Sequence, residues 1–426
     1  MIIPSIDIQN GEAVQLVGGR ELELRAGDPL EIAERWSLAG DMAVIDLDAA
    51  MGKGDNREVI RELVKRHRCR VGGGIRSLES ALDWLDCGAE KIIIGTAATP
   101  ELLSQLPAER IMVALDAVDG EVVVEGWRQT TGRRQEEVLV ELRELAGSFL
   151  VTFVEREGRL NGTDMDSAQR LIGLAGSSRV TIAGGVSTAA EVANLDRMGA
   201  DAQVGMALYN GELDLAEAMA APLSSDRPDG LWPTVICDPA GTALGLAYSS
   251  LDSLRRAVAQ RRGVYQSRSR GLWAKGETSG NTQQLLRVDL DCDRDTLRFT
   301  VRQRGEGFCH RQTATCWGPA AGLVDLERRL AERVLDSPPG SYTSKLLNDQ
   351  ALLAEKLKEE AIELAEAAGS DDVTWEAADL IYFALVAMLR GGATLEGVAK
   401  ELDGRARRVR RRSQTALAPG GEEGRS

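Results

Sequence analysis

The segment Asp7-Ile-Gln-Asn-Gly-Glu-Ala-Val14 near the start of the chain recurs as Asp116-Ala-Val-Asp-Gly-Glu-Val-Val123. Two further pairs of segments keep the same offset of about 110 residues, which is typical of an internal repeat. The pattern predicts that residues 1–222 consist of two similar, fused halves. The other pairs are Gly73-Gly-Ile-Arg-Ser77 with Gly184-Gly-Val-Ser-Thr188, and Ile94-Gly-Thr-Ala97 with Val204-Gly-Met-Ala207.

Apolar, strand-like runs alternate with amphipathic, helix-like stretches throughout this region. The helix-like stretches include Asp28–Gly40 and Ser77–Gly88. Eight alternating units in about 220 residues favour a parallel (β/α)8 barrel of the TIM type. The predicted strands are Ile2–Ile8, Met42–Asp48, Cys69–Ile75, Lys91–Thr96, Ile111–Ala117, Phe149–Glu155, Arg179–Gly185 and Ala202–Leu208.

The repeated residues lie where a barrel of this type holds its active site, at the carboxyl ends of the strands. Each half has one aspartate at the end of its first strand, Asp7 and Asp116. Each half also has glycine turns, and such turns at helix starts bind phosphate through backbone N–H groups. The sequence therefore predicts a ligand with a phosphate at each end and two aspartates acting as acid and base. The alternative, that the glycines only form tight turns, is disfavoured by the two matched pairs.

The stretches IIPSIDIQNGEAVQLVGG, VIDLDAA, VGGGIRS, IIIGTAA, ALDAVDGEVVVEGW and GMALYNG resemble the phosphoribosylformimino-aminoimidazole carboxamide ribotide isomerases of histidine biosynthesis. The resemblance implies an Amadori rearrangement of an aminoaldose into an aminoketose. It implies that Asp7 is the base at ribose C2, that Asp116 is the acid that opens the furanose, and that Thr152 assists. The implied phosphate contacts are Gly74, Arg76, Gly95 and Thr96 at one end, and Gly184, Gly185 and Gly205 at the other.

One segment departs from this family's pattern. Glu157-Gly158-Arg159 stands where the family has Asp-Gly-Thr, so the carboxylate is one methylene longer and the threonine is absent. An alternative hypothesis is therefore a catalytically inactive, structural barrel. The related cyclase shares the fold but has a lysine near its first strand, and no lysine precedes Lys53 here.

A second group of candidate metal-binding and catalytic residues lies within 231–320, after a turn-rich linker at 223–230. Cys292 lies within the acidic run Asp291–Asp295, and Cys309-His310 and Cys316 follow. Thiolates suit zinc and carboxylates suit magnesium. In a strand, the three aspartates would share one face, with the cysteine on the other. Three thiolates leave the fourth zinc position open for water, as in a hydrolytic site. The alternative is a set of core cysteines beside a solvated acidic turn.

Upstream, Arg268, Arg270 and Lys275 form a plausible phosphate cradle. The combined pattern GVYQSRSRGLWAKGETSGN…DLDCDRD…CH…C closely resembles phosphoribosyl-AMP cyclohydrolase, a small α+β zinc enzyme that opens the adenine ring by hydrolysis between N1 and C6. The resemblance implies a homodimer, because the zinc ligands of that family come from two subunits. It assigns zinc to Cys292, Cys309 and Cys316, magnesium to Asp291, Asp293 and Asp295, and the role of general base to His310.

Helical patterns replace strand patterns over residues 321–413. Two predicted helices, about Leu346–Ala368 and Thr374–Arg390, carry acidic residues three and four positions apart, on one side. Such crowding suits a bound cation, although a solvated acidic face is the alternative. PPGSYTSKLLND…EKLKEEAIELAEA…WEAADLIYFALVAML resembles the all-α, MazG-like phosphoribosyl-ATP pyrophosphohydrolases. By this resemblance, the magnesium ligands are Glu359, Glu360, Glu363, Glu376 and Asp379.

The composition is that of a soluble globular protein with two or three domains. The chain has 426 residues and a formal net charge of −15, which disfavours bulk binding to nucleic acid. No apolar run reaches membrane length, and isolated cysteines such as Cys69 fit a reducing cytoplasm. Residues 414–426 are expected to form a disordered tail.

Together, the segments predict three consecutive steps of histidine biosynthesis in one chain. A bifunctional hydrolase with an inactive barrel, and a nucleotide-binding regulator, are the alternatives.

Overall fold

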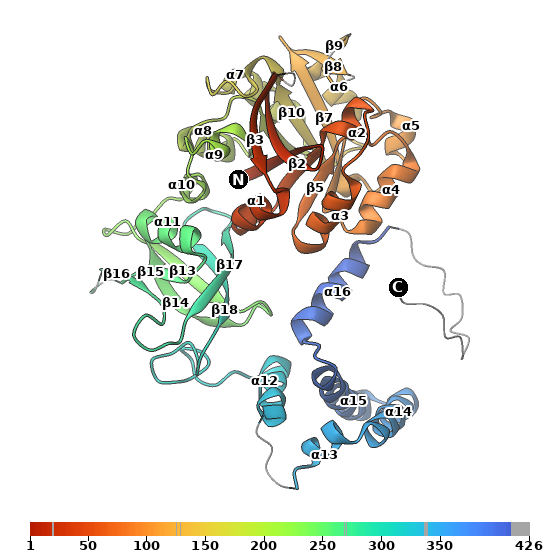
Figure 1. Ribbon diagram of the computed structural model, residues 1–426, viewed down its shortest axis with the longest axis vertical. Coiled ribbons are helices and arrows are strands. Elements are labelled where there is room, and N and C mark those ends of the chain that lie inside the picture. Colours follow the sequence, from red (N-terminus) through yellow and green to blue (C-terminus); the bar gives the residue numbers. More distant parts are fainter. Residues whose placement is uncertain are drawn as a thin grey trace.

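The computed structural model describes residues 1–18, 21–124, 126–127, 129–267, 269, 271–335 and 340–409. The chain forms a barrel, then a smaller β-sheet domain, then a group of helices (Figure 1). This order confirms the predicted fold classes. The predicted phosphate contacts Arg268 and Arg270, and the predicted tail at 414–426, lie outside the described residues.

Eight parallel strands close into the barrel, in the order β10-β11-β12-β1-β4-β5-β6-β7, and β7 pairs with β10 to complete the ring. All eight predicted strands are confirmed, although several end earlier than expected. The strands are β1 (Ile2–Gln9), β4 (Met42–Asp46), β5 (Cys69–Gly72), β6 (Lys91–Ile94), β7 (Ile111–Val118), β10 (Ser148–Phe153), β11 (Arg179–Ala183) and β12 (Asp201–Val204).

The internal repeat is visible in the backbone. The hairpin β2 (Glu12–Val17) and β3 (Glu21–Gly27) follows β1, and β8 (Glu121–Val124) and β9 (Gln129–Arg134) follow β7 in the same way.

Equivalent glycines end the third strand of each half. Gly73 has φ +97°, and a Cβ there would lie 2.2 Å from the Asp46 carbonyl oxygen. Gly184 has φ +91°, and a Cβ would lie 2.4 Å from the Phe153 carbonyl oxygen. Only glycine fits either turn, since any side chain would clash with the neighbouring strand.

Helices surround the barrel, and several of them begin at capping residues that the sequence supplies. Ser77 accepts a hydrogen bond from the Ser80 amide at the start of α4, and Thr188 forms a capping box with Glu191 at the start of α8. The apolar faces of the helices cover the sheet. The helices are α1 (Pro29–Trp36), α2 (Leu47–Met51), α3 (Arg57–Arg66), α4 (Leu78–Cys87), α5 (Pro100–Leu103), α6 (Gln135–Leu142), α7 (Met165–Leu174), α8 (Ala189–Arg197), α9 (Met206–Tyr209) and α10 (Leu215–Ala220).

The middle domain is a four-stranded sheet in the order β14-β13-β18-β17. Its core contains Tyr265 and Phe299, and the buried Tyr265 hydroxyl donates to Gln283 Oε1 at 2.7 Å. The elements are β13 (Trp232–Cys237), β14 (Ala243–Ser249), α11 (Leu251–Gln260), β15 (Val264–Ser267), β16 (Gly271–Ala274), β17 (Gln283–Leu290) and β18 (Leu297–Gln303).

The expectation that Asp291–Asp295 lies in a strand is wrong. β17 ends at Leu290 and β18 begins at Leu297, so the acidic run forms the loop between them. Arg294 has φ +63°, a left-handed conformation that a strand does not contain. We call residues 291–296 the carboxylate loop.

The C-terminal domain is helical, with Leu346, Leu353, Phe383 and Val386 in its core. The predicted helix about Leu346–Ala368 is divided in two, because Asp349 ends one helix and caps the next by accepting from the Leu352 amide. The helices are α12 (Gly322–Leu335), α13 (Tyr342–Asn348), α14 (Gln350–Glu366), α15 (Ser370–Arg390) and α16 (Leu395–Arg407).

The last helix, α16, extends from the helical domain to the barrel (Figure 1). The Arg110 guanidinium donates to the Arg407 carbonyl oxygen at 2.8 Å, and the Val409 amide donates to Asp86 Oδ1 at 3.0 Å. Among the described residues, no single helix is long and apolar enough to cross a membrane. One pair, α15 with α16, passes that test only when joined across a bend of 104°.

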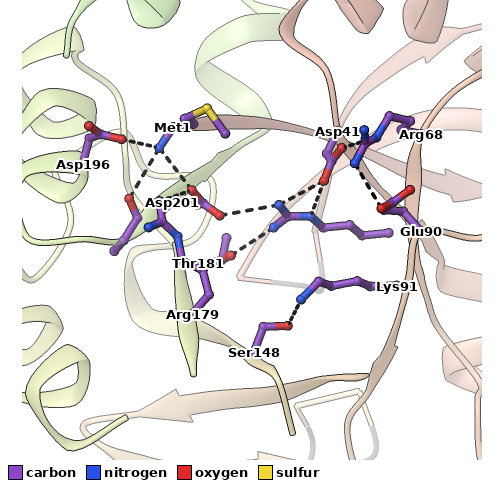
Figure 2. Close-up of polar contacts among 12 residues, drawn as sticks. Met1, Asp41, Arg68, Glu90, Lys91, Ser148, Arg179, Thr181, Asp196 and Asp201 are labelled. Carbon is purple, nitrogen blue, oxygen red and sulfur yellow. Dashed lines mark hydrogen bonds and ion pairs between the residues drawn. The ribbon is translucent and has the colours of Figure 1, made fainter. Parts of the chain in front are cut away.

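A polar cluster fills the base of the barrel, at the amino ends of its strands (Figure 2). The buried Arg70 guanidinium lies 3.3 Å from Asp41, 3.5 Å from Asp201 and 3.2 Å from the Thr181 hydroxyl. Arg179 also binds Asp201 at 2.8 Å. Burial raises the pKa of Asp201, but the Met1 amine, followed by Arg179 and Arg70, outweighs burial and lowers the pKa to about 2. The arginines and aspartates at the base of the barrel thus neutralise one another's charge.

Replacing Arg70 with methionine is expected to lower the free energy of unfolding of the barrel by about 3–5 kcal/mol, because buried carboxylates lose a partner. Urea denaturation followed by tryptophan fluorescence measures the change. The matched control is Arg133→Met, which removes an exposed ion pair with Glu141 and should change stability by less than about 1 kcal/mol. Equal effects of the two variants would contradict the account of the base.

Candidate functional site

A cavity of about 840 Å³ opens at the carboxyl ends of the barrel strands. Its wall includes Asp7, Asp116 and Thr152 from the ends of β1, β7 and β10. Thr152 stands beside Asp116 in register, because β10 and β7 are the pair that closes the barrel. The cavity thus brings together the three residues for which the sequence predicts acid, base and assisting roles.

The Asp7 carboxyl lines the cavity but is surrounded by protein atoms. The Ser5 hydroxyl and the Gln15 side-chain amide each donate to it at 3.4 Å. Burial outweighs these two hydrogen bonds and raises the pKa of Asp7 to about 7. At neutral pH, Asp7 is poised between its acid and base forms, which suits a group that removes a proton.

Asp116 also lines the cavity and has a different set of partners. The Trp127 indole N–H donates to Asp116 Oδ2 at 2.8 Å, and Thr152 also hydrogen-bonds to it. Burial raises the pKa of Asp116 despite these donors. A raised pKa favours the protonated form, which suits a group that donates a proton.

Glu157 adds a third carboxyl group to the cavity. Burial, together with the nearby carboxyls of Asp7 and Asp116, raises the pKa of Glu157 to about 8. The Glu157 carboxyl is therefore largely neutral at pH 7. In that form it adds no negative charge to the pair of aspartates.

The predicted phosphate contacts lie in two places. Gly74, Arg76, Gly95 and Thr96 line the main cavity, while Gly184 and Gly185 line a neighbouring hollow, and Gly205 lines both. The Arg76 guanidinium is held by the carbonyl oxygens of Ala49 and Ala50, at 3.1 and 2.7 Å. The hollow measures about 20 Å³, which is room for about one water molecule. The first cradle is open in this conformation and the second is narrow.

The middle domain gathers two of the three predicted zinc ligands. The thiols of Cys309 and Cys316 contact each other, and the Arg311 backbone amide, as the main cause, lowers the pKa of Cys309. The thiolate is the form that binds zinc. Cys292 lies on the exposed carboxylate loop. Within the described ranges, the groups of three or more possible ligands within 4.8 Å consist of carboxylates alone, so one chain does not assemble the three sulfurs.

Two other predicted residues flank the cysteine pair. His310 Nδ1 lies 3.7 Å from Cys309 Sγ. The Lys275 ammonium lies 5.0 Å from the centre of the Phe308 ring, and burial lowers its pKa. Gly245 packs against this group so closely that a Cβ would lie 2.2 Å from the Phe308 ring.

The three aspartates of the carboxylate loop converge even though the loop is not a strand. Asp291, Asp293 and Asp295 each place a carboxylate oxygen within 4.8 Å of the others. The Asp291 carboxylate also accepts from the backbone amides of Asp295 and Thr296, at 3.0 and 3.2 Å. The donors are hard oxygens in a tight group, which fits a magnesium ion.

The helical domain forms a second group of carboxylates. Glu360 and Glu363 of α14 and Glu376 of α15 have oxygens within 4.8 Å of one another. Burial, followed by the neighbouring charges of Glu363 and Asp379, raises the pKa of Glu360. The predicted ligand Glu359 instead pairs with Lys356 at 2.7 Å. The two helices thus bring three of the five predicted carboxylates together, and the charge of a fourth, Asp379, acts on Glu360 and Glu376.

Three residues of the barrel site were not predicted from the sequence. Gln15 and Ser5 position Asp7, and Trp127 positions Asp116. The role of Gln15 could have been suspected from the sequence, because a glutamine within the apolar strand Glu12–Val17 needs a hydrogen-bond partner when it is buried. The contact of Trp127 had no comparable signal, since it depends on the path of the chain after β8.

Family comparisons agree with this arrangement. Residues 1–214 match the family described as histidine biosynthesis protein, residues 245–318 match phosphoribosyl-AMP cyclohydrolase, and residues 323–406 match phosphoribosyl-ATP pyrophosphohydrolase.

Individual relatives match different extents of the chain. A histidine biosynthesis trifunctional protein of Neurospora crassa is 34% identical over 375 residues, covering 84% of this chain and 40% of the relative. One from Komagataella pastoris is 48% identical over 202 residues, covering 47% of this chain and 24% of the relative. The chain thus spans less than half the length of these fungal relatives.

A third relative is the size of the barrel. It is named as the isomerase of a doubly phosphoribosylated imidazole-4-carboxamide, from Methanosphaerula palustris. It is 43% identical over 233 residues, which are 52% of this chain and 98% of that protein. The barrel, its cavity and these matches together show that the chain belongs to the histidine biosynthesis protein family, with a phosphoribosyl-AMP cyclohydrolase domain and a phosphoribosyl-ATP pyrophosphohydrolase domain following the barrel.

Proposed function

We propose that this chain catalyses three consecutive steps of histidine biosynthesis. Residues 321–413 remove pyrophosphate from phosphoribosyl-ATP, and residues 231–320 open the ring of phosphoribosyl-AMP. Residues 1–222 isomerise the resulting aminoaldose, and residues 223–230 join the barrel to the middle domain. The reactions run in the reverse order of the domains. We place the enzyme in the cytoplasm, on the basis of its cysteine usage.

The observation that carries the isomerase assignment is the pair of aspartates in the barrel cavity. They lie at the ends of equivalent strands, with glycine cradles on both sides. A substrate with a phosphate at each end would place its central ribose between Asp7 and Asp116. The narrow second cradle must widen to accept a phosphate, so we expect the loop around Gly158 to move on binding.

The chemistry follows from the protonation states. Asp116, held by Trp127 and Thr152, donates its proton to the furanose ring oxygen as the bond from that oxygen to C1 breaks, which leaves a protonated imine. Asp7 removes the proton from C2, and the electron pair moves to form an enolamine. Protonation of C1, together with loss of the proton on the C2 hydroxyl, gives the aminoketose. Glu157, neutral at pH 7, can donate a hydrogen bond without raising the negative charge of the site.

In the middle domain, the residues fit the metals that the family implies. Cys309, Cys316 and a Cys292 from a second chain would hold zinc, and the three aspartates of the carboxylate loop would hold magnesium. Zinc would supply the activation of water for ring opening. His310, beside Cys309, would accept a proton, and Lys275, beside Phe308, would contact a phosphate. Since one chain gathers only two sulfurs, we propose that the active form is a homodimer.

In the helical domain, Glu360, Glu363, Glu376 and Asp379 would hold magnesium, which would offset the charge of the phosphate groups. Burial, followed by the charges of Glu363 and Asp379, raises the pKa of Glu360, and a bound cation would relieve the repulsion among these carboxylates. Glu359 is the weakest of the five assigned ligands, because it pairs with Lys356. Water positioned by the carboxylates would cleave between the α and β phosphates.

Substitution of either cavity aspartate tests the isomerase assignment. Asp7→Asn and Asp116→Asn are each expected to lower kcat/KM for the aminoaldose by about 10²–10⁴-fold, because acid or base catalysis is lost. The control is Asp119→Asn, on the exposed turn after β7, which should keep full activity. Absence of conversion by the unmutated chain, with both hydrolases active, would mean that the barrel is structural and that the chain is a bifunctional hydrolase.

The pKa of Asp7 predicts the acid side of the pH profile. A base must be deprotonated, and the pKa of Asp7 is about 7. We expect kcat/KM for isomerisation to rise about tenfold per pH unit below pH 7 and to level off above it, as the Asp7 carboxyl loses its proton. A rate that is constant between about pH 5 and 7 would show that Asp7 is not the base.

Mixing two inactive variants tests the shared zinc site. Cys292→Ser and Cys316→Ser should each abolish ring opening. After joint refolding, half of the dimers contain one chain of each kind and therefore one complete site out of two, so about one quarter of the activity should return. Mixing two samples of Cys316→Ser is the control. No recovery in the mixed sample would place all three ligands on one chain.

A further inference from the structure

Arg294 connects the carboxylate loop to the barrel. Its guanidinium forms a two-pronged contact with the Asp196 carboxylate of α8, with Nε to Oδ2 at 2.8 Å and Nη2 to Oδ1 at 3.0 Å. The remaining nitrogen, Nη1, donates to the carbonyl oxygen of Asp291 within the loop. One side chain thus joins the first residue of the loop to a helix of another domain.

The barrel side of this contact is rigid. The Asp196 side chain is only 6% exposed, and its carboxylate also accepts from the Met1 amine at 2.9 Å (Figure 2). That amine also reaches Asp201, 3.1 Å away, in the polar cluster of the base. A buried carboxylate with several fixed donors has little freedom to move, so it makes a firm anchor.

The linker holds Arg294 at a second point. The Ser224 backbone amide donates to the Arg294 carbonyl oxygen at 2.8 Å. Arg294 is the left-handed residue of the loop, with φ +63°. Its backbone and its side chain are therefore both tied to residues outside the middle domain's own sheet.

We propose that the barrel, through Asp196, positions the carboxylate loop of the cyclohydrolase domain for metal binding. This inference rests on the proposed magnesium role of Asp291, Asp293 and Asp295. Three converging carboxylates repel one another, and a free loop would separate them. Because Arg294 is held through both its backbone and its side chain, the loop has less conformational entropy to lose when it binds a cation. The binding site is in this sense preorganised. The barrel then supports the second reaction regardless of whether it catalyses the third.

The contact differs in kind from the other ion pairs between the two domains. Arg261 at the end of α11 binds Glu34 of α1 at 3.0 Å, and Arg255 binds Glu217 of α10 at 3.2 Å. Both pairs join barrel and middle domain, but neither involves the carboxylate loop. Glu34 therefore supplies a matched control: it also lies in the barrel and also pairs with an arginine of the middle domain.

The test compares Asp196→Asn with Glu34→Gln in the full chain. Hydrogen exchange is measured on the backbone amides of Asp295 and Thr296, which bind the Asp291 carboxylate, and Mg²⁺ affinity is measured by calorimetry in the zinc-loaded protein. Glu359→Gln, Glu363→Gln and Glu376→Gln in the background chain remove the helical-domain site from the calorimetric signal. We expect Asp196→Asn to weaken Mg²⁺ binding about tenfold and to speed exchange of the loop amides. Glu34→Gln should change neither.

The possible outcomes distinguish the positioning role of Asp196 from the proposed magnesium site itself. Unchanged exchange and affinity in Asp196→Asn would overturn the positioning role. Absence of Mg²⁺ binding to the background chain would instead refute the proposed metal site, and the exchange data would still report on the anchor. If Asp196→Asn fails to fold, Arg294→Ala tests the same contact from the other side. Loss of loop protection without loss of barrel stability is then the supporting result.

Discussion

Closure of the eight-stranded sheet, where β7 pairs with β10, is the constraint on which the rest of the molecule depends. Closure separates the ends of the strands into two faces with different roles. The carboxyl ends form one mouth with a cavity that contains Asp7, Asp116 and Glu157. The amino ends form one base, in which Arg70, Asp201 and their partners satisfy one another's charge. The two faces correspond to the usual division between function and stability in barrels of this class.

In the described part of the chain, the other two domains contact the barrel near its base, and the residues that line the cavity all belong to the barrel. Glu34 lies in the helix before β4, Asp86 lies before β6, and Asp196 lies before β12. Each of the three binds a residue from beyond the barrel. Substrate access to the cavity is therefore compatible with docking of the hydrolase domains. In the same region, the Arg294–Asp196 contact underlies our proposal that the barrel positions the carboxylate loop. A chain in which an isomerase precedes two hydrolases thus has a structural reason to keep them joined.

Much of this architecture could be predicted from the sequence, because it repeats or is periodic. The recurrence of the Asp7 segment at Asp116 predicted both halves of the barrel, and alternating apolar runs predicted all eight strands. The carboxylate loop was predicted wrongly as a strand, because alternation alone does not reveal the left-handed turn at Arg294. Contacts such as Arg294 with Asp196 join residues 98 positions apart, and no local pattern encodes such a pair. The structure places Cys292 apart from Cys309 within one chain, which supports the division of the zinc ligands between two chains that the family resemblance implied.

The central claim is that one chain converts one substrate through three reactions. The most direct measurement is mass spectrometry of the purified chain, incubated with phosphoribosyl-ATP, Mg²⁺ and Zn²⁺ and sampled over time, with the aldose and ketose products separated by chromatography. The account predicts release of pyrophosphate, transient phosphoribosyl-AMP and aminoaldose, and final accumulation of the aminoketose. Accumulation of the aminoaldose as the end product would contradict it, since the barrel would then bind the other domains without catalysing a reaction.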